Sequence, residues 1–190
     1  VSQDLLSAAE FELRFMEQND VKPIYFMDDD YPFRLKQCVD APIMLYVKGD
    51  VNLNAKRIVS IVGTRKATGY GRDLTDEIVK GLSHFDDLLI ISGLAYGIDV
   101  AAHKSCLKYG VPTVGVLAHG LDRIYPPLHY QISNDMQVHG ALVCDFTSGT
   151  KPDRENFPKR NRIIAGLADA TIVIEARKKG GALITAGIAN

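Results

Sequence analysis

The sequence contains no tryptophan and only three cysteines among its 190 residues. Cys38, Cys106 and Cys144 are odd in number and far apart, which argues against a disulfide framework. None of them forms the C-x-x-C spacing of a zinc site. We therefore expect buried thiols in a reducing compartment, a cytoplasmic location and no bound metal.

Long hydrophobic runs and an excess of charge are missing as well. The longest apolar stretches fall well short of the ~20 residues that span a bilayer, and no signal-peptide pattern opens the chain. We therefore expect no membrane segment. The 22 Lys and Arg residues stand against 23 Asp and Glu residues, for a net charge of −1. This balance argues against a generally basic coat for nucleic acid, so any site for a polyanion must be a local patch.

Short apolar stretches alternate with helical patterns along most of the chain. The predicted strands are residues 22–27, 43–48, 58–62, 88–91, 111–117, 141–144 and 171–175. The predicted helices are residues 2–19, 97–109, 130–138, 157–167, the stretch from 182 onward, and one that carries Leu74, Ile78, Val79, Leu82 and Phe85 on one side. This alternation predicts an α/β fold with a mostly parallel, doubly wound sheet and helices on both faces. In such sheets, ligands bind at the carboxyl ends of the strands, at the topological switch point.

Two parts of the chain are expected. Residues 1–20 are predicted to form a helix of imperfect periodicity, which either covers a neighbour or is the remnant of a small helical module. Residues 21–190 are predicted to form one domain of ordinary size. The chain begins with Val1 and stops at Asn190 within a predicted helix. We therefore expect a piece of a longer protein, truncated at the C-terminal end of this domain.

The stretch RIVSIVGTRKATGYGR joins a predicted buried strand to a helix through a glycine-marked loop. A helix that starts there exposes unpaired N–H groups and the positive end of its dipole, which suits phosphate. Gly63 and, after the next strand, Gly93 would let the backbone approach a phosphate, while Thr64 and Ser92 add hydroxyl donors and Arg65 adds a planar fork. The spacing matches neither G-x-G-x-x-G nor a Walker A loop. The alternative is an ordinary tight turn in which glycine serves the backbone alone.

A second unusual stretch, KPDRENFPKRNR, carries five basic residues against two acidic ones around Phe157. The basic residues are Lys151, Arg154, Lys159, Arg160 and Arg162. An exposed ring among cations suits single-stranded nucleic acid, because bases stack on the ring at ~1–3 kcal/mol each and cations meet phosphates. Two other interpretations stay open. Phe157 is a core residue at the start of a helix whose charges are solvated, or Asn161 and Arg162 are buried and tie loops together.

Two groups of residues imitate metal or catalytic sites. The consecutive aspartates 28–30 cannot share one face, so a solvated turn is expected there. Asp99 and His103 are one helical turn apart and close to Ser92 in sequence. These three residue types are those of a hydrolase triad. Ser92 lacks the G-x-S-x-G elbow, however, and a structural Asp–His pair is the expected arrangement.

Five ordered motifs resemble one known family. They are VGTRKATGYG, SGLAYGIDVAAH, GLDRIYPP, FPKRNRIIAGL and EARKKGGALITA, and they resemble the DNA-processing protein A family (DprA/Smf) over about residues 31–190. The resemblance implies an extended Rossmann-like domain that binds single-stranded DNA without known cofactor chemistry and is not an enzyme. It also implies loading of the RecA recombinase onto incoming strands in natural transformation, and a homodimer. One loop departs from the family pattern, with Ala118-His119 where relatives often carry a Gly-[CST]-Gly-like turn.

The family motifs G-[ST]-R, S-G-x-A-x-G-I-D and F-P-x-R-N-R-I-I begin here at Gly63, Ser92 and Phe157. A basic residue that precedes the phenylalanine in family members corresponds to either Arg154 or Lys151. The resemblance, together with the two stretches above, predicts DNA-binding residues at Gly63, Thr64, Arg65, Ser92, Gly93, Lys151, Arg154, Phe157, Lys159, Arg160, Asn161 and Arg162.

The alternative function is enzymatic. Phosphoribohydrolases of the lysine-decarboxylase-like fold also use a glycine-rich rim and a C-terminal Gly-Gly-x-x-[ST] turn, which GGALITA resembles. Glu175 and Arg162 could then serve a nucleoside monophosphate. The P-G-G-x-G-T-x-x-E signature of those enzymes is absent, because Lys178-Lys179 precede the two glycines and no acid follows in the required place.

Overall fold

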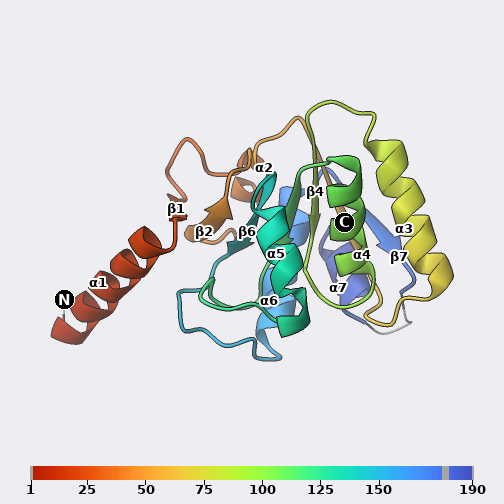
Figure 1. The fold of residues 1–190 in the computed structure, drawn as a ribbon. Coiled ribbons are helices and arrows are strands. Elements are labelled where there is room, and N and C mark those ends of the chain that lie inside the picture. Colours follow the sequence, from red (N-terminus) through yellow and green to blue (C-terminus); the bar gives the residue numbers. More distant parts are fainter. Residues whose placement is uncertain (1, 177–179, 190) are drawn as a thin grey trace.

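The computed structural model describes residues 2–176 and 180–189, and within them the chain forms a seven-stranded sheet (Figure 1). The strands are β1 (Val21–Tyr25), β2 (Met44–Gly49), β3 (Arg57–Gly63), β4 (Leu88–Ser92), β5 (Thr113–Val116), β6 (Gly140–Cys144) and β7 (Ala170–Ile174). Their order across the sheet is β1-β2-β6-β5-β4-β3-β7. β1, β2 and β6 pair antiparallel, whereas β6, β5, β4, β3 and β7 pair parallel. The predicted α/β fold with a mostly parallel sheet is confirmed, and two antiparallel strands extend it beyond β6.

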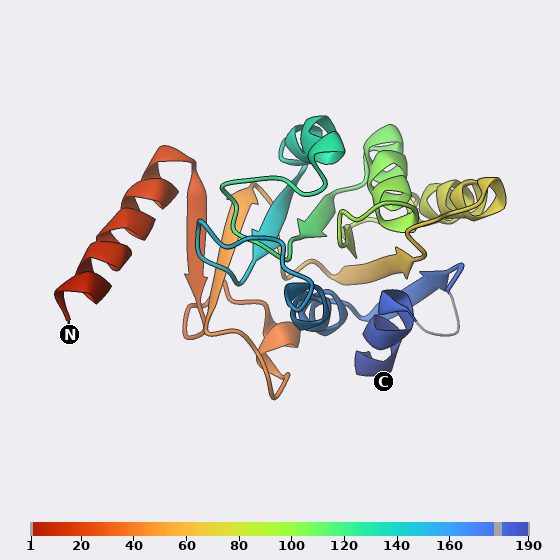
Figure 2. The same cartoon turned by 90° about the horizontal axis from the view of Figure 1, so that it is seen from below.

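Helices cover both faces of this sheet, as Figure 2 shows. α3 (Gly69–Leu82), α4 (Ile98–Tyr109) and α5 (Tyr130–Met136) lie on one face, with a 3-10 turn at Pro127–His129 leading into α5. α2 (Phe33–Lys36), α6 (Asn156–Leu167) and α7 (Gly181–Ile188) lie on the other face. The chain runs outward from β3 through β4 and β5 to β6 and returns to the other side of β3 as β7. The switch point of this doubly wound sheet therefore lies between β3 and β7, where ligand sites of such folds form.

Alternate residues of the central strands face the two helical layers. In β4, Leu89 and Ile91 belong to the core that α6 covers, while Leu88 and Ile90 belong to the core that α3 and α4 cover. All four side chains are buried. A strand covered on both faces needs apolar residues at every position, which explains why this run has no polar alternation.

The end of α3 differs from the sequence prediction. We expected Phe85 to continue the apolar side of this helix, but α3 ends at Leu82 and Phe85 lies in the turn that follows, 54% exposed. Its ring contacts Arg57, whose Cζ lies 5.7 Å from the ring centroid. The spacing of three residues between Leu82 and Phe85 therefore occurs without a helix.

The predicted N-terminal helix is confirmed as α1 (Gln3–Gln18), which projects from the β1 edge of the sheet (Figure 1). Ser2 is its N-cap, as expected, and accepts a hydrogen bond from the N–H of Leu5 at 3.4 Å. Met16 is buried at the end near β1. Glu12 accepts hydrogen bonds from the backbone N–H of Ser148 at 2.9 and 3.1 Å, which ties α1 to the loop after β6.

The structure also describes the features on which the expectations about membrane segments, metal sites, cysteines and the aspartate run depend. None of the described helices combines the length and apolar character needed to cross a membrane. Within residues 2–176 and 180–189, no group of three or more His, Cys, Asp and Glu side chains is placed to hold a metal ion. Cys106 and Cys144 are buried free thiols and Cys38 is a half-buried one, and burial raises the pKa of Cys106 to about 12. Aspartates 28–30 lie in a turn, as predicted.

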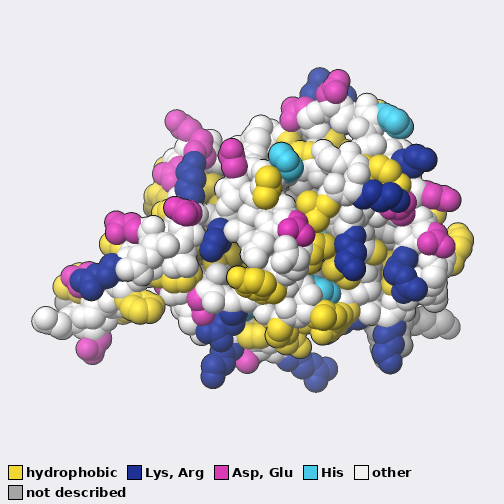
Figure 3. All heavy atoms as spheres, in the orientation of Figure 1, with side chains coloured by type: hydrophobic (Ala, Val, Ile, Leu, Met, Phe, Trp, Pro, Cys, Tyr) yellow, Lys and Arg dark blue, Asp and Glu magenta, His cyan; other side chains and the backbone are white. Residues whose placement is uncertain are grey.

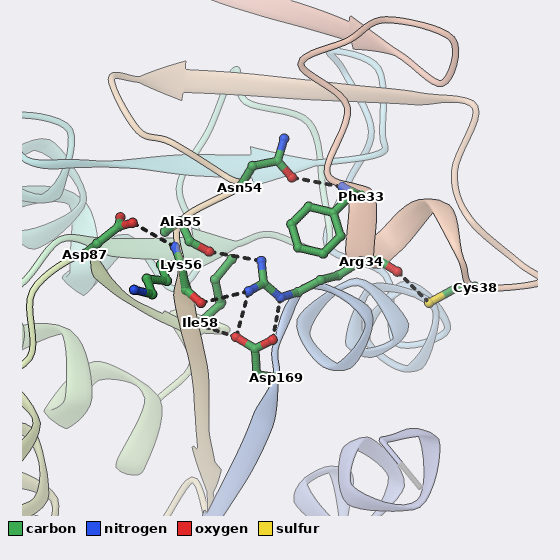
Figure 4. A network of polar contacts seen from close by, with 9 residues as sticks. All are labelled: Phe33, Arg34, Cys38, Asn54, Ala55, Lys56, Ile58, Asp87 and Asp169. Carbon is green, nitrogen blue, oxygen red and sulfur yellow. Dashed lines mark hydrogen bonds and ion pairs between the residues drawn. The ribbon is translucent and has the colours of Figure 1, made fainter.

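A polar network joins α2 to the starts of the strands β3 and β7 (Figure 4). The Arg34 guanidinium donates to both carboxylate oxygens of Asp169, at 2.6 and 2.8 Å, and to the carbonyls of Ala55 and Lys56. The same carboxylate accepts the backbone N–H of Ile58 at 2.8 Å. These hydrogen bonds hold α2 and residues 55–56 against the starts of β3 and β7.

Replacing Asp169 with alanine should therefore lower the free energy of unfolding at neutral pH by about 2 kcal/mol, because charged hydrogen bonds from Arg34 and Ile58 are lost. Burial alone raises the pKa of Asp169, but the hydrogen bonds from Arg34 and Ile58 and the charge of Arg34 outweigh it and leave that pKa below its ordinary value. The stabilisation is thus complete above the unfolded-state pKa of ~3.9 and is lost as the pH falls through the folded-state value. Urea titrations from pH 7 down to pH 3 should show the difference from the parent shrinking. An Asp29→Ala control, at an exposed turn position, should show no such difference at any pH.

Candidate nucleic-acid interface

A cleft of about 670 Å³ opens at the carboxyl ends of β3 and β7, at the switch point of the sheet. It is lined by the loop after β3, by the first turns of α6 and α7, and by parts of the loops before α5 and α6. The two stretches that the sequence singled out, one around Arg65 and one around Phe157, therefore line the same cleft although they are far apart in the chain.

Close packing fixes the backbone that follows β3. The carbonyl of Thr64 accepts the N–H of Ile98 at 3.2 Å. Gly97 has a φ of +81°, and a Cβ at that position would lie 2.9 Å from the Cα of Arg65 and closer still to the carbonyl oxygen of Thr64. A Cβ on Gly63 would lie 2.7 Å from the Cβ of Ile98. The room that we expected above Gly63 for a phosphate is thus filled by the protein, and this packed turn positions the exposed Arg65 side chain at the cleft.

The N-terminus of α3, where we expected a phosphate, is occupied by a carboxylate of the protein. Glu175 accepts hydrogen bonds from the Thr68 N–H at 2.8 Å and from the Thr68 hydroxyl. These hydrogen bonds lower the pKa of Glu175 below its ordinary value. Glu175 has a φ of +52°, which few non-glycine residues adopt. A phosphate at this helix would have to displace Glu175, so the anion-binding groups of the cleft are its own cationic side chains.

The ring of Phe157 lies close to two guanidinium groups at the cleft. The Cζ of Arg65 is 5.0 Å and the Cζ of Arg160 is 5.9 Å from the centroid of its ring, both within the range of cation–π attraction. Tyr125 approaches the same ring edge-on, with 6.2 Å between centroids. Phe157 is half-buried as the second residue of α6. It therefore packs at a helix start, as one interpretation held, and also presents part of its ring to the cleft.

Arg160 lines the cleft but is only 4% exposed. Its Nη1 donates to the carbonyls of Gly93, at 2.7 Å, and Val116, and its Nε donates to Asn161 Oδ1 at 3.2 Å. A Cβ on Gly93 would lie 2.6 Å from Asp99 Oδ2 and 2.7 Å from Arg160 Nη2, so both side chains approach a position that only glycine leaves open. Burial lowers the pKa of Arg160 to about 10, against the opposing effect of Asp99, and the guanidinium stays charged at neutral pH. Arg160 thus joins the ends of β4 and β5 behind the cleft.

The remaining predicted cations of the basic stretch separate into two groups. Arg154 is exposed and lines the cleft. Lys151 and Lys159 are exposed but are not among the residues that line it.

Arg162 points away from the cleft. Its Nη2 lies 2.5 Å from Asp145 Oδ2, and its Nη1 donates to the carbonyl of Asp40. Asn161 is buried and donates its side-chain amide to the carbonyl of Gly181 at 3.4 Å. These contacts agree with the interpretation in which both residues tie loops together. Arg162 and Glu175, which a phosphoribohydrolase would need on one nucleotide, both lie outside the cleft lining.

The hydrolase triad that we set aside does not form, and the structural Asp–His pair that we expected instead is wrong, because Asp99 Oδ2 accepts the N–H of Ala95 at 3.4 Å. Ser92 is fully buried, and its hydroxyl donates to the carbonyl of Ile61 at 2.6 Å, so it is not offered to a ligand. His103 Nδ1 lies 2.8 Å from Thr113 Oγ1. No Ser–His contact forms between these residues, because Ser92 ends its strand inside the core rather than on an exposed turn.

The cleft is cationic although the whole chain has a net charge of −1. Arg65, Lys66 and Arg154 line it with exposed side chains. Asp99 is the acidic residue among the described cleft-lining positions, and it is buried beside Arg160. Lys and Arg side chains project along much of the lower margin of Figure 3, the edge to which the loops after the parallel strands run. This arrangement can bind a flexible polyanion that also offers flat apolar surfaces.

Sequence reasoning did not single out Lys66 or Tyr125 as site residues. Lys66 follows Arg65 directly, and its position in the same exposed loop was the available signal. Tyr125 belongs to the family-like GLDRIYPP motif, but the motif does not show that its ring approaches Phe157.

Comparisons with known proteins agree with this fold. The family model for DNA recombination-mediator protein A matches residues 22–190. DNA processing protein DprA of Bacillus subtilis is 40% identical over 167 residues, which are 87% of this chain and 56% of that protein. The X-ray structure of DNA processing protein A from Streptococcus pneumoniae is similar with a TM-score of 0.85 and 34% identity, over 93% of this chain and 62% of that one. DNA processing protein A from Helicobacter pylori, described with a unique single-stranded DNA binding mode, has a TM-score of 0.80 and 26% identity, over 89% of this chain and 75% of that one.

The matched residues contain all five motifs on which the family resemblance depends. In the last of them, EARKKGGALITA, residues 177–179 lie outside the described part of the chain. The chain spans about half the length of the relatives that it matches in sequence. The resemblance is confirmed, and the chain belongs to the DNA recombination-mediator protein A family, which includes the DprA and Smf proteins.

Proposed function

We propose that this chain binds single-stranded DNA in the cleft, as a recombination mediator in the processing of incoming DNA. The observation that supports the proposal most is the Arg65 guanidinium 5.0 Å from the Phe157 ring, in a cleft with exposed cations. Unpaired bases stack on aromatic rings while cations bind the backbone, whereas a duplex keeps its base faces hidden. The binding mode described for the H. pylori relative supports the same class of ligand.

Each group has a role in this proposal. Arg65, Lys66 and Arg154 contact phosphates in the cleft, with Arg65 offering the planar fork that fits phosphate oxygens. Phe157 provides the stacking surface, and Tyr125 extends it. These roles are binding roles, and the proposal assigns no reaction to the cleft.

Other predicted positions contribute less directly. Lys151 and Lys159 contact phosphates where the strand leaves the cleft, since both are exposed near its α6 side. Gly63, Thr64 and Gly93 shape the backbone that holds the contacting side chains.

Fluorescence anisotropy with a labelled thymine oligonucleotide and a matched duplex tests the proposal. The chain should bind the single strand more tightly than the duplex. Each neutralised phosphate contributes a slope of roughly −0.7 to the dependence of log affinity on log salt, so three contacts imply a loss of roughly 20-fold between about 50 and about 200 mM salt. Equal affinity for the two DNA forms, or affinity independent of salt, would contradict the proposal.

Arg65→Ala should weaken single-strand binding by about fivefold to tenfold and reduce the salt slope by roughly 0.7, because one phosphate contact and its packing on Phe157 are lost. The matched control is Arg57→Ala, at the opposite end of the same strand, where the side chain contacts Phe85 and the Asp86 carbonyl. That variant should bind like the parent. Parent-like binding by Arg65→Ala at moderate salt would place the strand elsewhere.

The full-length protein is proposed to act with two protein partners. The family's description as a recombination mediator supports a role in loading RecA recombinase onto the bound strand. We further propose that the full-length protein is a homodimer and that residues 1–20 are the remnant of a small helical module. We expect the full-length protein to speed the assembly of RecA on a labelled single strand. The Arg65→Ala substitution in the full-length protein should reduce this acceleration.

A further inference from the structure

A second, smaller cavity of about 80 Å³ adjoins the cleft. It shares Arg65, Phe157 and Arg160 with the cleft, and Tyr96 and His119 are among its other lining residues. One water molecule needs roughly 10–15 Å³, so this cavity has room for several waters or for the edge of a flat ring. Tyr96 is 45% exposed, so the wall of the cavity extends to the surface.

His119 is one of the residues that line this cavity, and its ring carries an unused hydrogen-bond acceptor. The residue is 1% exposed, and its Nε2 has no hydrogen-bond partner among the described residues. Its Nδ1 lies 2.9 Å from the Gly120 carbonyl, which can only accept, so Nδ1 carries the ring proton. Burial lowers the pKa of His119, which keeps the ring neutral. The free nitrogen at the other edge of the ring therefore offers a lone pair, and a buried polar atom of this kind is costly to leave unpaired.

The other buried histidines do not share this arrangement. His103 also has an unpartnered Nε2, but it is absent from the lining of the cleft and of the cavity. The ring of His129 packs edge-on against the ring of Tyr96, with 5.1 Å between their centroids, and its Nδ1 contacts the Leu94 carbonyl at 2.8 Å. His119 is thus the histidine among the described residues that combines a free acceptor with a cavity wall.

The chemistry of the residues that line the cavity limits which part of a DNA strand can occupy it. A phosphate offers oxygen acceptors that a lone pair repels, so the phosphates of a bound strand belong outside this cavity. An unpaired base has a flat face that suits the rings of Tyr125 and Phe157. Thymine carries a ring N–H between two carbonyl oxygens. The ring N–H of that edge is a donor that suits the lone pair of His119. Its two carbonyl oxygens are acceptors that suit the guanidinium groups of Arg65 and Arg160, which line the same cavity.

We propose that this cavity receives the edge of one unpaired base and that His119 Nε2 accepts its ring N–H, which makes His119 a specificity-determining residue for thymine-like bases. The inference rests on the proposed binding of single-stranded DNA in the adjoining cleft.

The parent protein gives the primary test. Anisotropy should be measured with a labelled hexathymidylate and with the same oligonucleotide in which every thymine is methylated at N3. The methylated strand keeps its phosphates and rings but has no ring N–H, so the parent should bind it roughly tenfold more weakly, the effect of one hydrogen bond of about 1.4 kcal/mol. Equal binding of both strands would overturn the role of His119 and leave the cleft proposal standing. Binding of neither strand would overturn both.

Variants separate the hydrogen bond from the bulk of the added methyl group. His119→Leu should bind the two strands with nearly equal affinity, because no acceptor remains to discriminate them. The matched control is His139→Leu, at an exposed histidine just before β6, which should keep the parent's discrimination. A folded His119→Leu protein that still discriminates about tenfold would assign the effect to the methyl group and overturn the proposal. If His119→Leu does not fold, His119→Gln, which keeps an acceptor, should retain discrimination, and its loss would count against the proposal.

Discussion

Replacing Arg160 with methionine is expected to lower the free energy of unfolding by about 3–5 kcal/mol, the usual cost of leaving a buried charge without its counter-charge. Methionine fills part of the space but leaves Asp99 buried beside Gly93 without its counter-charge. The carbonyls of Gly93 and Val116 also lose their donor. Because these carbonyls end β4 and β5, the loss should loosen the edge of the sheet that carries the cleft. Urea unfolding monitored by circular dichroism measures the effect.

The neighbouring Lys159→Met variant is the control, because that side chain is exposed and its loss should change stability by less than about 0.5 kcal/mol. A double variant, Asp99→Asn with Arg160→Met, should lose less than the sum of the two single losses, since it removes the uncompensated charge. An Arg160→Met protein with the parent's unfolding midpoint but without DNA binding would contradict this interpretation. Arg160 would then be a direct contact to the ligand rather than part of the frame.

The sheet could be predicted from the sequence because burial on both faces leaves a direct signature. The run Leu88–Ser92 is apolar up to its last residue, and only a strand covered by helices on both sides needs that pattern. Phe85 shows the limit of the same reasoning. It continues the spacing of α3 by one step, yet the helix has already ended, and only the contact with Arg57 explains its place.

The cleft could be predicted in outline and not in detail. Gly-Thr-Arg after one strand and Phe157 in a basic stretch correctly indicated two segments that meet at the switch point. The sequence does not show which of Lys159, Arg160 and Arg162 is exposed and which is buried. Successive helix positions point about 100° apart, so each of these side chains lies in a different environment. Glu175 at the start of α3 was missed for a related reason. Its partner Thr68 is distant in sequence, and no local pattern announces the contact.

Replacing Gly97 with alanine should destabilise the protein by about 4 kcal/mol, the sum of backbone strain and overpacking. The residue has a φ of +81°, which a side chain disfavours, and a new Cβ would overlap the Thr64 carbonyl and lie 2.9 Å from the Cα of Arg65. Both neighbours are backbone, so no rotamer change can relieve the contact. The loop after β3 must move instead, and it carries Arg65 with it.

Gly110→Ala is the matched control, since Gly110 at the other end of α4 has a φ of +68° and nothing within 4 Å of an added Cβ. It should cost only the strain of a left-handed residue, about 1–2 kcal/mol, and should leave DNA binding unchanged. Gly97→Ala should lose both stability and single-strand affinity, measured by urea unfolding and by anisotropy at a temperature where the variant remains folded. Equal losses of stability in the two variants would mean that the backbone after β3 is free to shift. Parent-like affinity in folded Gly97→Ala would mean that the position of Arg65 does not depend on this packed turn.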